Sequence, residues 1–416
     1  MTASDVHTRL DVERIRADFP ILAREIDGRP LAYLDSANSA QKPRQMIDAM
    51  SHFYATSYAN VHRAVYRLGV EATEAFEGTR SKVRALLNAP SEREIIFTRD
   101  TTEAINLVAY SYGRTNLGPG DVIVTTEIEH HSNLVPWQQL AQATGAQLRY
   151  VHIDEHGELR LDELEEIERA GNVKLLAVVD QSNSLGTINP IRDLADWVHG
   201  LGGVIVVDGA QSVPHRPVDV QAMRADFLAF SGHKLCGPSG AGALWGRREL
   251  LEAMPPFLTG GEMIRSVRLA GTSFNDLPWK FEAGTPAIAE VVGMGAAIDY
   301  VTGIGLDAIH DHETVITAYA LERLAEVPGL TVHGPSDPAR RGGVVSFSLD
   351  GVHPHDVAEI LGADGVCVRA GHHCTQPVMD ALGVAATTRA SFYLYTVPEE
   401  IDRMIESLHR VRGIFA

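Results

Sequence analysis

LLAVVDQSNSLGTINPIRDLADWVHGLGGVIVVD, residues 175–208, contains two strand-like runs separated by a helical pattern. The runs LLAVVD and GVIVVD are apolar without alternation, which is typical of strands that helices cover on both faces. Between them Asn189 can cap a helix, Pro190 suits its first turn, and glycines end it by Gly202. The stretch therefore predicts two strands of an open, mostly parallel sheet and the helix that connects them.

Similar runs occur earlier in the chain, at EIIFT (94–98) and DVIVTT (121–126). After about residue 290 the pattern changes to a long helical stretch, followed by the runs GVVSFSLD and GVCVRA. We therefore predict the α/β class, with a large, mostly parallel-sheet domain and a smaller α/β C-terminal domain. The expected division is an N-terminal arm over residues 1–30 that packs with the small domain, a large domain over 31–300, and a small domain over 301–416.

The composition favours a globular protein and argues against several partners. The chain has 416 residues, of which 45% are hydrophobic and 22% charged. Its net charge of −18 would repel a nucleic-acid backbone. The N-terminus mixes both charges, and 18 consecutive apolar residues occur nowhere, so we expect neither a targeting peptide nor a membrane partner. Three cysteines are too few for a disulfide framework and predict a cytoplasmic location.

In open α/β sheets, ligands bind beyond the carboxyl ends of the strands, so the residues that follow the strands are the first candidates for a site. Thr101 and Thr102 follow EIIFT and open a helix, where hydroxyls and free N–H groups can hold an anion. Asp208 ends the run GVIVVD. Taken alone, Thr101 is explained as a helix cap and Asp208 as a structural carboxylate.

SGHKLCGPSGAG (231–242) follows a further strand-like run and places Lys234 among small, mostly apolar residues. An enclosed lysine is unusual, because desolvation lowers its pKa and frees the amine to form a Schiff base. The glycines match neither a P-loop nor a dinucleotide fingerprint. An anion site, a strand-end carboxylate and a Schiff-base lysine are together the set that pyridoxal 5'-phosphate needs.

This set of residues suggests roles for two more, His130 and Arg389. His130, in EIEHH after DVIVTT, is placed where an imidazole could stack on the ring and move protons, although a backbone-satisfied histidine is the simpler explanation. Arg389, in TTRASF, could grip the carboxylate of an amino acid, although most arginines are solvated or salt-bridged.

RAGHHC (369–374) sets two histidines against Cys374 and leaves three chemistries open. A zinc site is disfavoured, because neighbours in an extended loop point in opposite directions and no CxxC pattern supplies further ligands, so we expect no metal. A cysteine hydrolase would leave Lys234 and Asp208 without a role. Sulfur transfer accounts for all three sites.

These segments resemble the fold-type I, class V pyridoxal phosphate enzymes, and specifically the SufS-type (group II) cysteine desulfurases. The resemblance covers nearly the whole chain, and SGHK with RAGHHC is its most specific part. The segments that carry it are RADFP (16–20), YLDSANSAQKP (33–43), NVHR (60–63), TTEAINLVA, EIEHHSNLVPW, QSNSLGT, VDGAQS, FSGHK, FEAGTP, VRAGHHC and TRASF.

The resemblance implies how the cofactor would be held. Lys234 would carry it as a Schiff base, Asp208 would pair with its pyridinium nitrogen, and His130 would stack on its ring. The remaining cofactor contacts would be Thr101, Thr102, Asn183, Gln211, Ser231, His233 and, from the other subunit, Thr285.

It also implies the catalytic and substrate-binding residues. Lys234 would remove the Cα proton of L-cysteine, Cys374 would accept the sulfur as a persulfide, and His130 would carry a proton at the departing thiol. Alanine would be the other product. The substrate contacts would be Arg389 for the carboxylate, together with Asn38, Asn183, Arg369 and His372.

The implied partners are a second copy of the chain that shares the active site and a SufE-like or SufU-like sulfur acceptor in iron–sulfur cluster assembly by the SUF pathway. Cleavage of selenocysteine is also implied. Two positions depart from the family pattern, because Asn38 and Thr375 stand where alanine is usual. The rival hypotheses are a transaminase or an amino-acid hydrolase on the same fold, and a catalytically silent scaffold.

Overall fold

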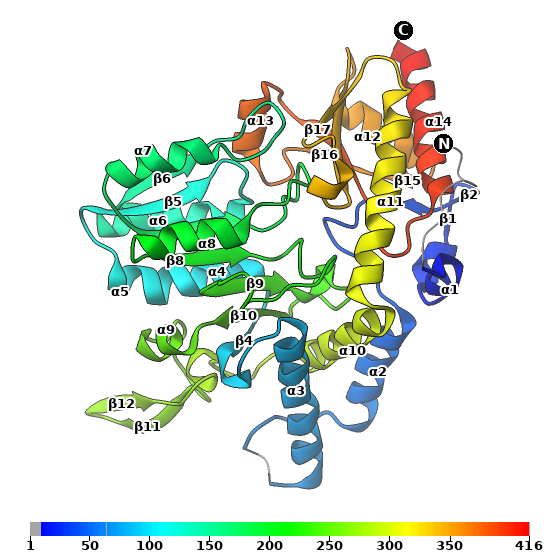
Figure 1. Cartoon of the computed structure of the whole chain (residues 1–416). Coiled ribbons are helices and arrows are strands. Elements are labelled where there is room, and N and C mark those ends of the chain that lie inside the picture. Colours follow the sequence, from blue (N-terminus) through cyan, green and yellow to red (C-terminus); the bar gives the residue numbers. More distant parts are fainter. Residues whose placement is uncertain (1–9, 64, 416) are drawn as a thin grey trace.

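A seven-stranded sheet runs through the larger lobe in the order β4–β10–β9–β8–β7–β5–β6 (Figure 1). We describe it from a computed structural model that covers residues 10–63 and 65–415. All neighbouring strands are parallel except β10, which is antiparallel to β4 and β9, so the prediction of a mostly parallel sheet is confirmed. The strands are β4 (Ile95–Thr98), β5 (Asp121–Thr126), β6 (Gln147–Val151), β7 (Asn172–Val179), β8 (Val204–Asp208), β9 (Phe227–Ser231) and β10 (Gly242–Gly246).

The central strands are buried on both faces, which explains their uninterrupted apolar runs. Along β9, Phe227 joins the hydrophobic cluster on one face of the sheet, and Leu228 and Phe230 join the cluster on the other. Helices α3 (Arg67–Leu86), α8 (Ile191–Gly200) and α10 (Ile288–Ile304) contribute to the cluster that contains Phe230. Helices α4 (Thr101–Leu107), α6 (Val135–Thr144) and α9 (Arg248–Ala253) contribute to the opposite cluster.

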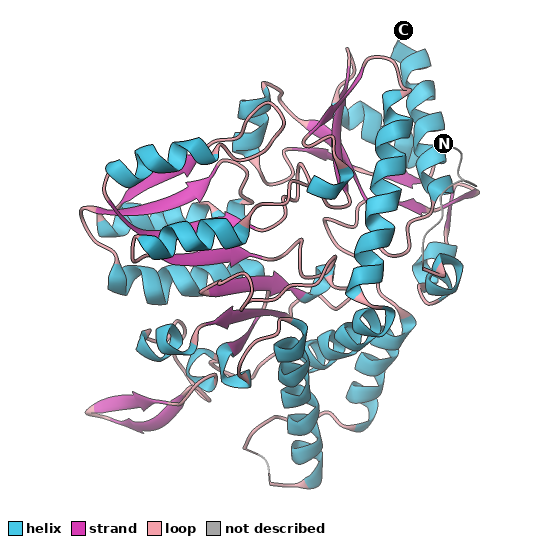
Figure 2. Cartoon of the chain, viewed as in Figure 1, coloured by secondary structure: helices cyan, strands magenta, loops and turns pink. Residues whose placement is uncertain are grey.

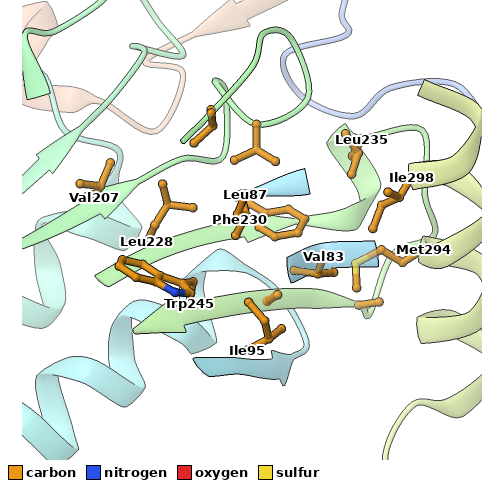
Figure 3. Packing of buried hydrophobic residues seen from close by; sticks show 14 of the residues in the cluster. Val83, Leu87, Ile95, Val207, Leu228, Phe230, Leu235, Trp245, Met294 and Ile298 are labelled. Atoms are coloured by element: carbon orange, nitrogen blue, oxygen red, sulfur yellow. The ribbon is translucent and has the colours of Figure 1, made fainter. Parts of the chain in front are cut away.

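Figure 3 shows Val83, Phe230 and Met294 in the cluster between β9, α3 and α10. All three side chains are fully buried. Complete burial of one such side chain stabilises the fold by about 1.5–3 kcal/mol relative to leaving it exposed. This packing gives the strand that leads to Lys234 a rigid base.

The smaller lobe is built on a four-stranded antiparallel sheet in the order β13–β14–β17–β16. Its elements are β13 (Leu330–His333), β14 (Val344–Leu349), β16 (Arg369–Gly371), β17 (Thr387–Ser391), α11 (Leu306–Ala325), α12 (Pro354–Ala363), α13 (Gln376–Leu382) and α14 (Pro398–Phe415). The run GVCVRA forms two strands rather than one. Its first part, β15 (Val366–Cys367), pairs in parallel with β3 (Ala32–Tyr33), whereas β16 pairs with β17. Different partners therefore divide the run.

Residues 10–30, the described part of the predicted N-terminal arm, lie against the smaller lobe (Figure 1), whereas residues 1–9 lie outside the described residues. The described part of the arm contains α1 (Val12–Ala17), β1 (Glu25–Ile26) and β2 (Arg29–Pro30), and the Arg16 guanidinium lies 3.1 Å from the Glu400 carboxylate of α14. The proposed domain limits stay a prediction. Between the lobes, α10 and α11 meet at Gly305 and are bent by 73°. Over the described residues, this bent pair passes a length and hydropathy test for a membrane span, and no single helix does.

The hairpin of β11 (Ile264–Arg268) and β12 (Gly271–Phe274) projects from the body of the larger lobe (Figure 2). The remaining helices are α2 (Arg44–Thr56), α5 (Arg114–Asn116) and α7 (Leu164–Arg169). Most side chains of the hairpin are exposed, including Val267 and Leu269.

Candidate active site

A cleft lies between the two lobes. It is lined by residues at or after the ends of β4, β5, β7, β8 and β9 and by residues of the smaller lobe. Predicted site residues that line it are Asn38, Thr101, Thr102, His130, Asn183, Asp208, Gln211, Ser231, His233, Lys234, Arg369, Cys374 and Arg389. Two predicted residues lie elsewhere. His372 is exposed outside the lining, and Thr285 lines a separate groove beside Arg99 and Glu103.

Lys234 ends the short turn Gly232–Lys234 that follows β9. Burial lowers its pKa to about 8, and the Asp208 carboxylate opposes that shift. The Lys42 ammonium stabilises this turn. Its Nζ donates to the carbonyl oxygens of His233 at 2.8 Å and of Ala40 at 2.7 Å. The turn that carries Lys234 is therefore held in place, and the Lys234 amine is more easily deprotonated than that of a lysine in water.

The pKa of about 8 predicts how the cofactor-free protein takes up an aldehyde. Only the neutral amine attacks a carbonyl, so about a tenth of Lys234 is reactive at pH 7 and about nine tenths at pH 9. We expect the rate of pyridoxal 5'-phosphate attachment, followed by absorbance, to rise with pH and level off above about pH 8. Nα-acetyl-lysine is the control, because its rate should keep rising to about pH 10. A midpoint equal to that of the free amine would contradict the assignment.

Asp208 ends β8 and is buried. Burial raises the pKa of its carboxyl group, whereas the backbone N–H of Ala210, at 2.9 Å from Oδ1, and the charge of Lys234 lower it. A buried carboxylate is stable only when a cation or hydrogen-bond donors face it. A protonated ring nitrogen would be such a partner.

Four hydroxyl groups form two pairs at one end of the cleft. Thr101 Oγ1 lies 2.7 Å from Ser231 Oγ, and Thr102 Oγ1 lies 2.7 Å from Ser132 Oγ. The Thr101 backbone N–H also donates to Ser231 Oγ at 2.9 Å. Hydroxyl hydrogens rotate to suit a ligand, so this group can turn its donors towards a phosphate.

His130 lies at the start of the turn that follows β5, and its Nδ1 accepts the backbone N–H of Ser132 at 3.0 Å. This hydrogen bond assigns the ring proton to Nε2. Burial, with a smaller effect of the Lys234 charge, lowers the pKa of His130 to about 3. The ring is therefore neutral at pH 7, which suits stacking. Its expected role in carrying a proton stays a prediction.

Two buried amides present oxygen atoms without a partner. Gln211 Nε2 donates to the Ala37 carbonyl, and Asn183 Nδ2 donates to the His373 carbonyl, each at 2.7 Å. Among the described residues, Gln211 Oε1 and Asn183 Oδ1 have no hydrogen-bond partner. Leaving a buried acceptor unpaired is costly, so these two atoms indicate a ligand with donor groups.

Arg389 is buried in β17 with one guanidinium nitrogen unused. Its Nη1 donates to the Asn183 carbonyl at 2.8 Å, and its Nη2 donates to Asp35 Oδ1 at 3.1 Å. The Nε atom has no partner among the described residues. Burial lowers the pKa of this side chain, and Asp35 opposes the shift. An arginine fixed at two nitrogens with a third left over can receive a carboxylate.

Cys374 lies in the loop between β16 and α13 and lines the same cleft as Lys234. His373 and Cys374 both have positive φ angles, 53° and 58°, which non-glycine residues seldom adopt. Gly371, with φ of 126°, allows the turn that precedes them. Arg369 Nη2 lies 3.7 Å from Cys374 Sγ, and the Cys374 carbonyl accepts the backbone N–H of His131 at 2.8 Å. Both lobes therefore hold the thiol loop.

The other two cysteines, Cys236 and Cys367, lie outside the cleft lining. Burial raises the pKa of Cys236 to about 12, and burial also raises the pKa of Cys367 in β15. Both are therefore ordinary thiols at neutral pH. Over the described ranges, no group of three or more His, Cys, Asp or Glu side chains is arranged to hold a metal.

Sequence reasoning missed three residues of this site. Asp35 pairs with Arg389, Ser132 pairs with Thr102, and His373 lines the cleft where His372 was expected to. Asp35 had a usable signal, because it closely follows a short strand, as Asp208 does. Ser132 and His373 carry no such signal.

The residues present fit pyridoxal 5'-phosphate. A reactive lysine amine, a buried carboxylate, a cluster of hydroxyls and two unpaired amide oxygens line one cleft. These features match its aldehyde, ring nitrogen, phosphate and hydroxyl group respectively. No further group is needed to account for them.

Comparisons with known proteins identify the family of the chain. The family model described as Aminotransferase class-V matches residues 32–404. A protein of Haloferax volcanii named cysteine desulfurase is 49% identical over 98% of both chains, and one of Dickeya dadantii with the same name is 51% identical over 97% of both. A solved apo structure of cysteine desulfurase from Thermococcus onnurineus NA1 has a TM-score of 0.92 and 39% identity, covering 98% of this chain and all of the other. The chain therefore belongs to the aminotransferase class-V family, and within it to the cysteine desulfurases.

Proposed function

We propose that this protein is a pyridoxal phosphate-dependent cysteine desulfurase that converts L-cysteine to L-alanine and leaves the sulfur on Cys374 as a persulfide. The observation that carries the proposal is that a thiol, a lysine amine and a partly unused arginine line one cleft. A transaminase would need the lysine and the arginine but would give Cys374 no role. A scaffold would give none of the three a role.

Different residues of the chain serve different steps of the proposed reaction. Pyridoxal 5'-phosphate, when bound, supplies an aldehyde that holds the substrate amino group and a ring that accepts electrons from the adjacent carbon. Arg389, whose Nε has no partner among the described residues, holds the substrate carboxylate, and Asp208 keeps a positive charge on the ring nitrogen. Lys234, released from the cofactor, takes the Cα proton.

Cys374 then attacks the substrate sulfur. The carbon–sulfur bond of L-cysteine breaks and a sulfur–sulfur bond forms on Cys374, so the transferred sulfur is oxidised and the substrate carbon is reduced. A proton replaces sulfur on that carbon, which gives L-alanine. No outside oxidant or reductant is required.

Mass spectrometry of the intact protein tests this proposal directly. After the cofactor-loaded enzyme is mixed with one equivalent of L-cysteine, we expect a mass increase of one sulfur atom, located in the peptide that contains Cys374, together with one equivalent of L-alanine. Iodoacetamide-blocked enzyme is the control and should gain no sulfur. Alanine without added sulfur on Cys374 would overturn the proposal.

The proposed assembly is a homodimer that shares its active sites. Thr285, which the family resemblance assigns to the phosphate, lines a groove outside the cleft of its own chain, so it would have to serve the cleft of a second copy. The projecting hairpin exposes Val267 and Leu269, and α2 and α3 expose Tyr54 and Leu68. Exposed apolar groups and unpaired hairpin edges are typical of surfaces that a partner covers.

The proposed role is sulfur supply for iron–sulfur cluster assembly in the cytoplasm by the SUF pathway, through a SufE-like or SufU-like acceptor protein. The short interval from Arg369 to Cys374 supports it, because this interval resembles the loop of the group II enzymes. Cleavage of L-selenocysteine is proposed on the same resemblance. A reducing compartment suits a protein whose three cysteines are all free thiols.

A further inference from the structure

Asn38 lies in the loop that follows β3 and links two charged groups of the cleft. Its Oδ1 accepts from Arg369 Nη1 at 2.5 Å, and its Nδ2 donates to Asp35 Oδ2 at 3.3 Å. The amide oxygen therefore faces the cationic Arg369, and the amide N–H faces the anionic Asp35. This arrangement fixes the orientation of the amide.

The link extends in both directions. Asp35 Oδ1 accepts from Arg389 Nη2 at 3.1 Å, and Arg369 Nη2 lies 3.7 Å from Cys374 Sγ. A continuous series of contacts thus runs from the arginine assigned to the substrate carboxylate to the thiol assigned to the sulfur. Asn38 is the central member of that series.

Asn38 is also what holds Arg369 in place. The side chain of Arg369 is long and only half-buried. Its hydrogen bonds in the described structure go to Asn38 and Cys374, and the thiol is a weak acceptor. Without the Asn38 oxygen, a flexible guanidinium next to solvent would lose its strong fixed acceptor.

We propose that Asn38 is a positioning residue that holds the Arg369 guanidinium beside Cys374 Sγ, so that the cation faces the sulfur that attacks the substrate and the persulfide that forms on it. The inference rests on the proposed function, in which Cys374 is the sulfur acceptor. It replaces the expectation that Asn38 contacts the substrate. A cation close to a cysteine stabilises the nucleophilic thiolate, and this effect requires the cation to stay in place.

Two substitutions of Asn38 test the amide oxygen and the amide N–H separately. Asn38→Ala removes both hydrogen bonds, whereas Asn38→Asp keeps an oxygen for Arg369 and removes the donor to Asp35. If positioning of Arg369 is the function, the aspartate variant should lose less than the alanine variant, because Arg369 keeps an oxygen acceptor. It should not match the wild type, because the new carboxylate lies beside Asp35. Asn116→Ala is the matched control, because Asn116 is exposed, lies outside the cleft lining and makes a hydrogen bond to the Tyr112 carbonyl.

The first measurement is the rate at which iodoacetamide alkylates Cys374 in the cofactor-loaded enzyme without substrate, at fixed pH, quantified on the Cys374 peptide. We expect Asn38→Ala to slow alkylation by about 3–10-fold, on the basis of one charge-assisted contact in a solvent-exposed setting. Asn116→Ala should stay within about twofold of the wild type, and Asn38→Asp should lie between the wild type and Asn38→Ala. An alanine variant that reacts as fast as the wild type would refute the proposal.

The second measurement separates chemistry from substrate capture. In single turnovers with L-cysteine, Asn38→Ala should slow persulfide formation by a similar factor. The spectral titration with L-alanine, which reports binding through Lys234 and Arg389, should change by less than about twofold. A loss confined to L-alanine binding would assign Asn38 to substrate contact and overturn the positioning role.

A double-mutant cycle identifies the residue through which Asn38 acts. In an Arg369→Ala background, Asn38→Ala should have no further effect on alkylation, because the group it positions is gone. Additive losses would show that Asn38 acts by another route and would contradict the proposal. The alkylation arm needs no turnover, so a wild type that forms no persulfide would refute the proposed function while this arm still tests the position of Arg369.

Discussion

Lys234→Ala is expected to abolish covalent attachment of pyridoxal 5'-phosphate and to lower desulfurase activity by at least about 10²–10⁴-fold. The loss removes both the amine that bonds the aldehyde and the base that takes the Cα proton, and acid–base catalysis alone contributes a factor of that size. The measurement is borohydride reduction of the loaded protein followed by mass spectrometry, together with a coupled assay for L-alanine. The reduced wild type should carry the cofactor on the Lys234 peptide, and the variant should carry none.

Lys82→Ala is the matched control, since Lys82 is a half-exposed lysine that pairs with Asp299 on the surface of α3. This variant should retain the cofactor and full activity. Circular dichroism should show that both variants are folded. Stable, reducible cofactor in Lys234→Ala, or activity within tenfold of the wild type, would remove Lys234 from its assigned role.

Cys374→Ser should leave the cofactor bound and its spectrum intact but suppress sulfide and alanine release from L-cysteine by on the order of 10³-fold or more. A serine hydroxyl stays protonated at neutral pH and is a poor nucleophile towards sulfur, so the step that forms the sulfur–sulfur bond fails. Binding of L-cysteine should persist, because Arg389 and Lys234 are unchanged. The assay is release of sulfide in the presence of dithiothreitol.

Cys367→Ser provides the comparison, because Cys367 is a half-buried thiol of β15 outside the cleft lining. It should keep sulfide release within a few-fold of the wild type. Undiminished release by Cys374→Ser would eliminate the persulfide mechanism and favour direct elimination of sulfide at the cofactor. Turnover of L-selenocysteine should fall less in Cys374→Ser than turnover of L-cysteine.

The strands of the large lobe and most of its candidate site residues could be predicted from the sequence, because each is marked by a local sequence pattern. Strands covered on both faces are continuous apolar runs, and the candidate site residues lie where those runs end. Asp208 and Lys234 illustrate this, since each lies within a few residues of a strand that the composition already marks. Because the carboxyl ends of parallel strands lie at the same edge of a sheet, residues that follow successive strands are brought together there.

Other features depend on contacts between distant segments and leave no local signal. His372 and His373 are identical neighbours, and the fold of the loop decides that His373 is buried with its Nε2 at 2.8 Å from Thr387 Oγ1. The role of Asp35 depends on Arg389, a residue 354 positions away. Likewise, the division of GVCVRA between two sheets depends on the pairing of β15 with β3.

That pairing has a consequence for the order in which the enzyme is made. β3 and β15 run in parallel, so the loops that leave them, one with Asp35 and Asn38 and the other with Arg369 and Cys374, emerge side by side. Segments so far apart in the chain meet only after a large loop closes, and such contacts form slowly. During synthesis, Lys234 and Asp208 leave the ribosome long before residue 367. The segment that carries Lys234 and Asp208 is therefore made first, and Cys374 reaches these residues only when the segments around β3 and β15 have come together.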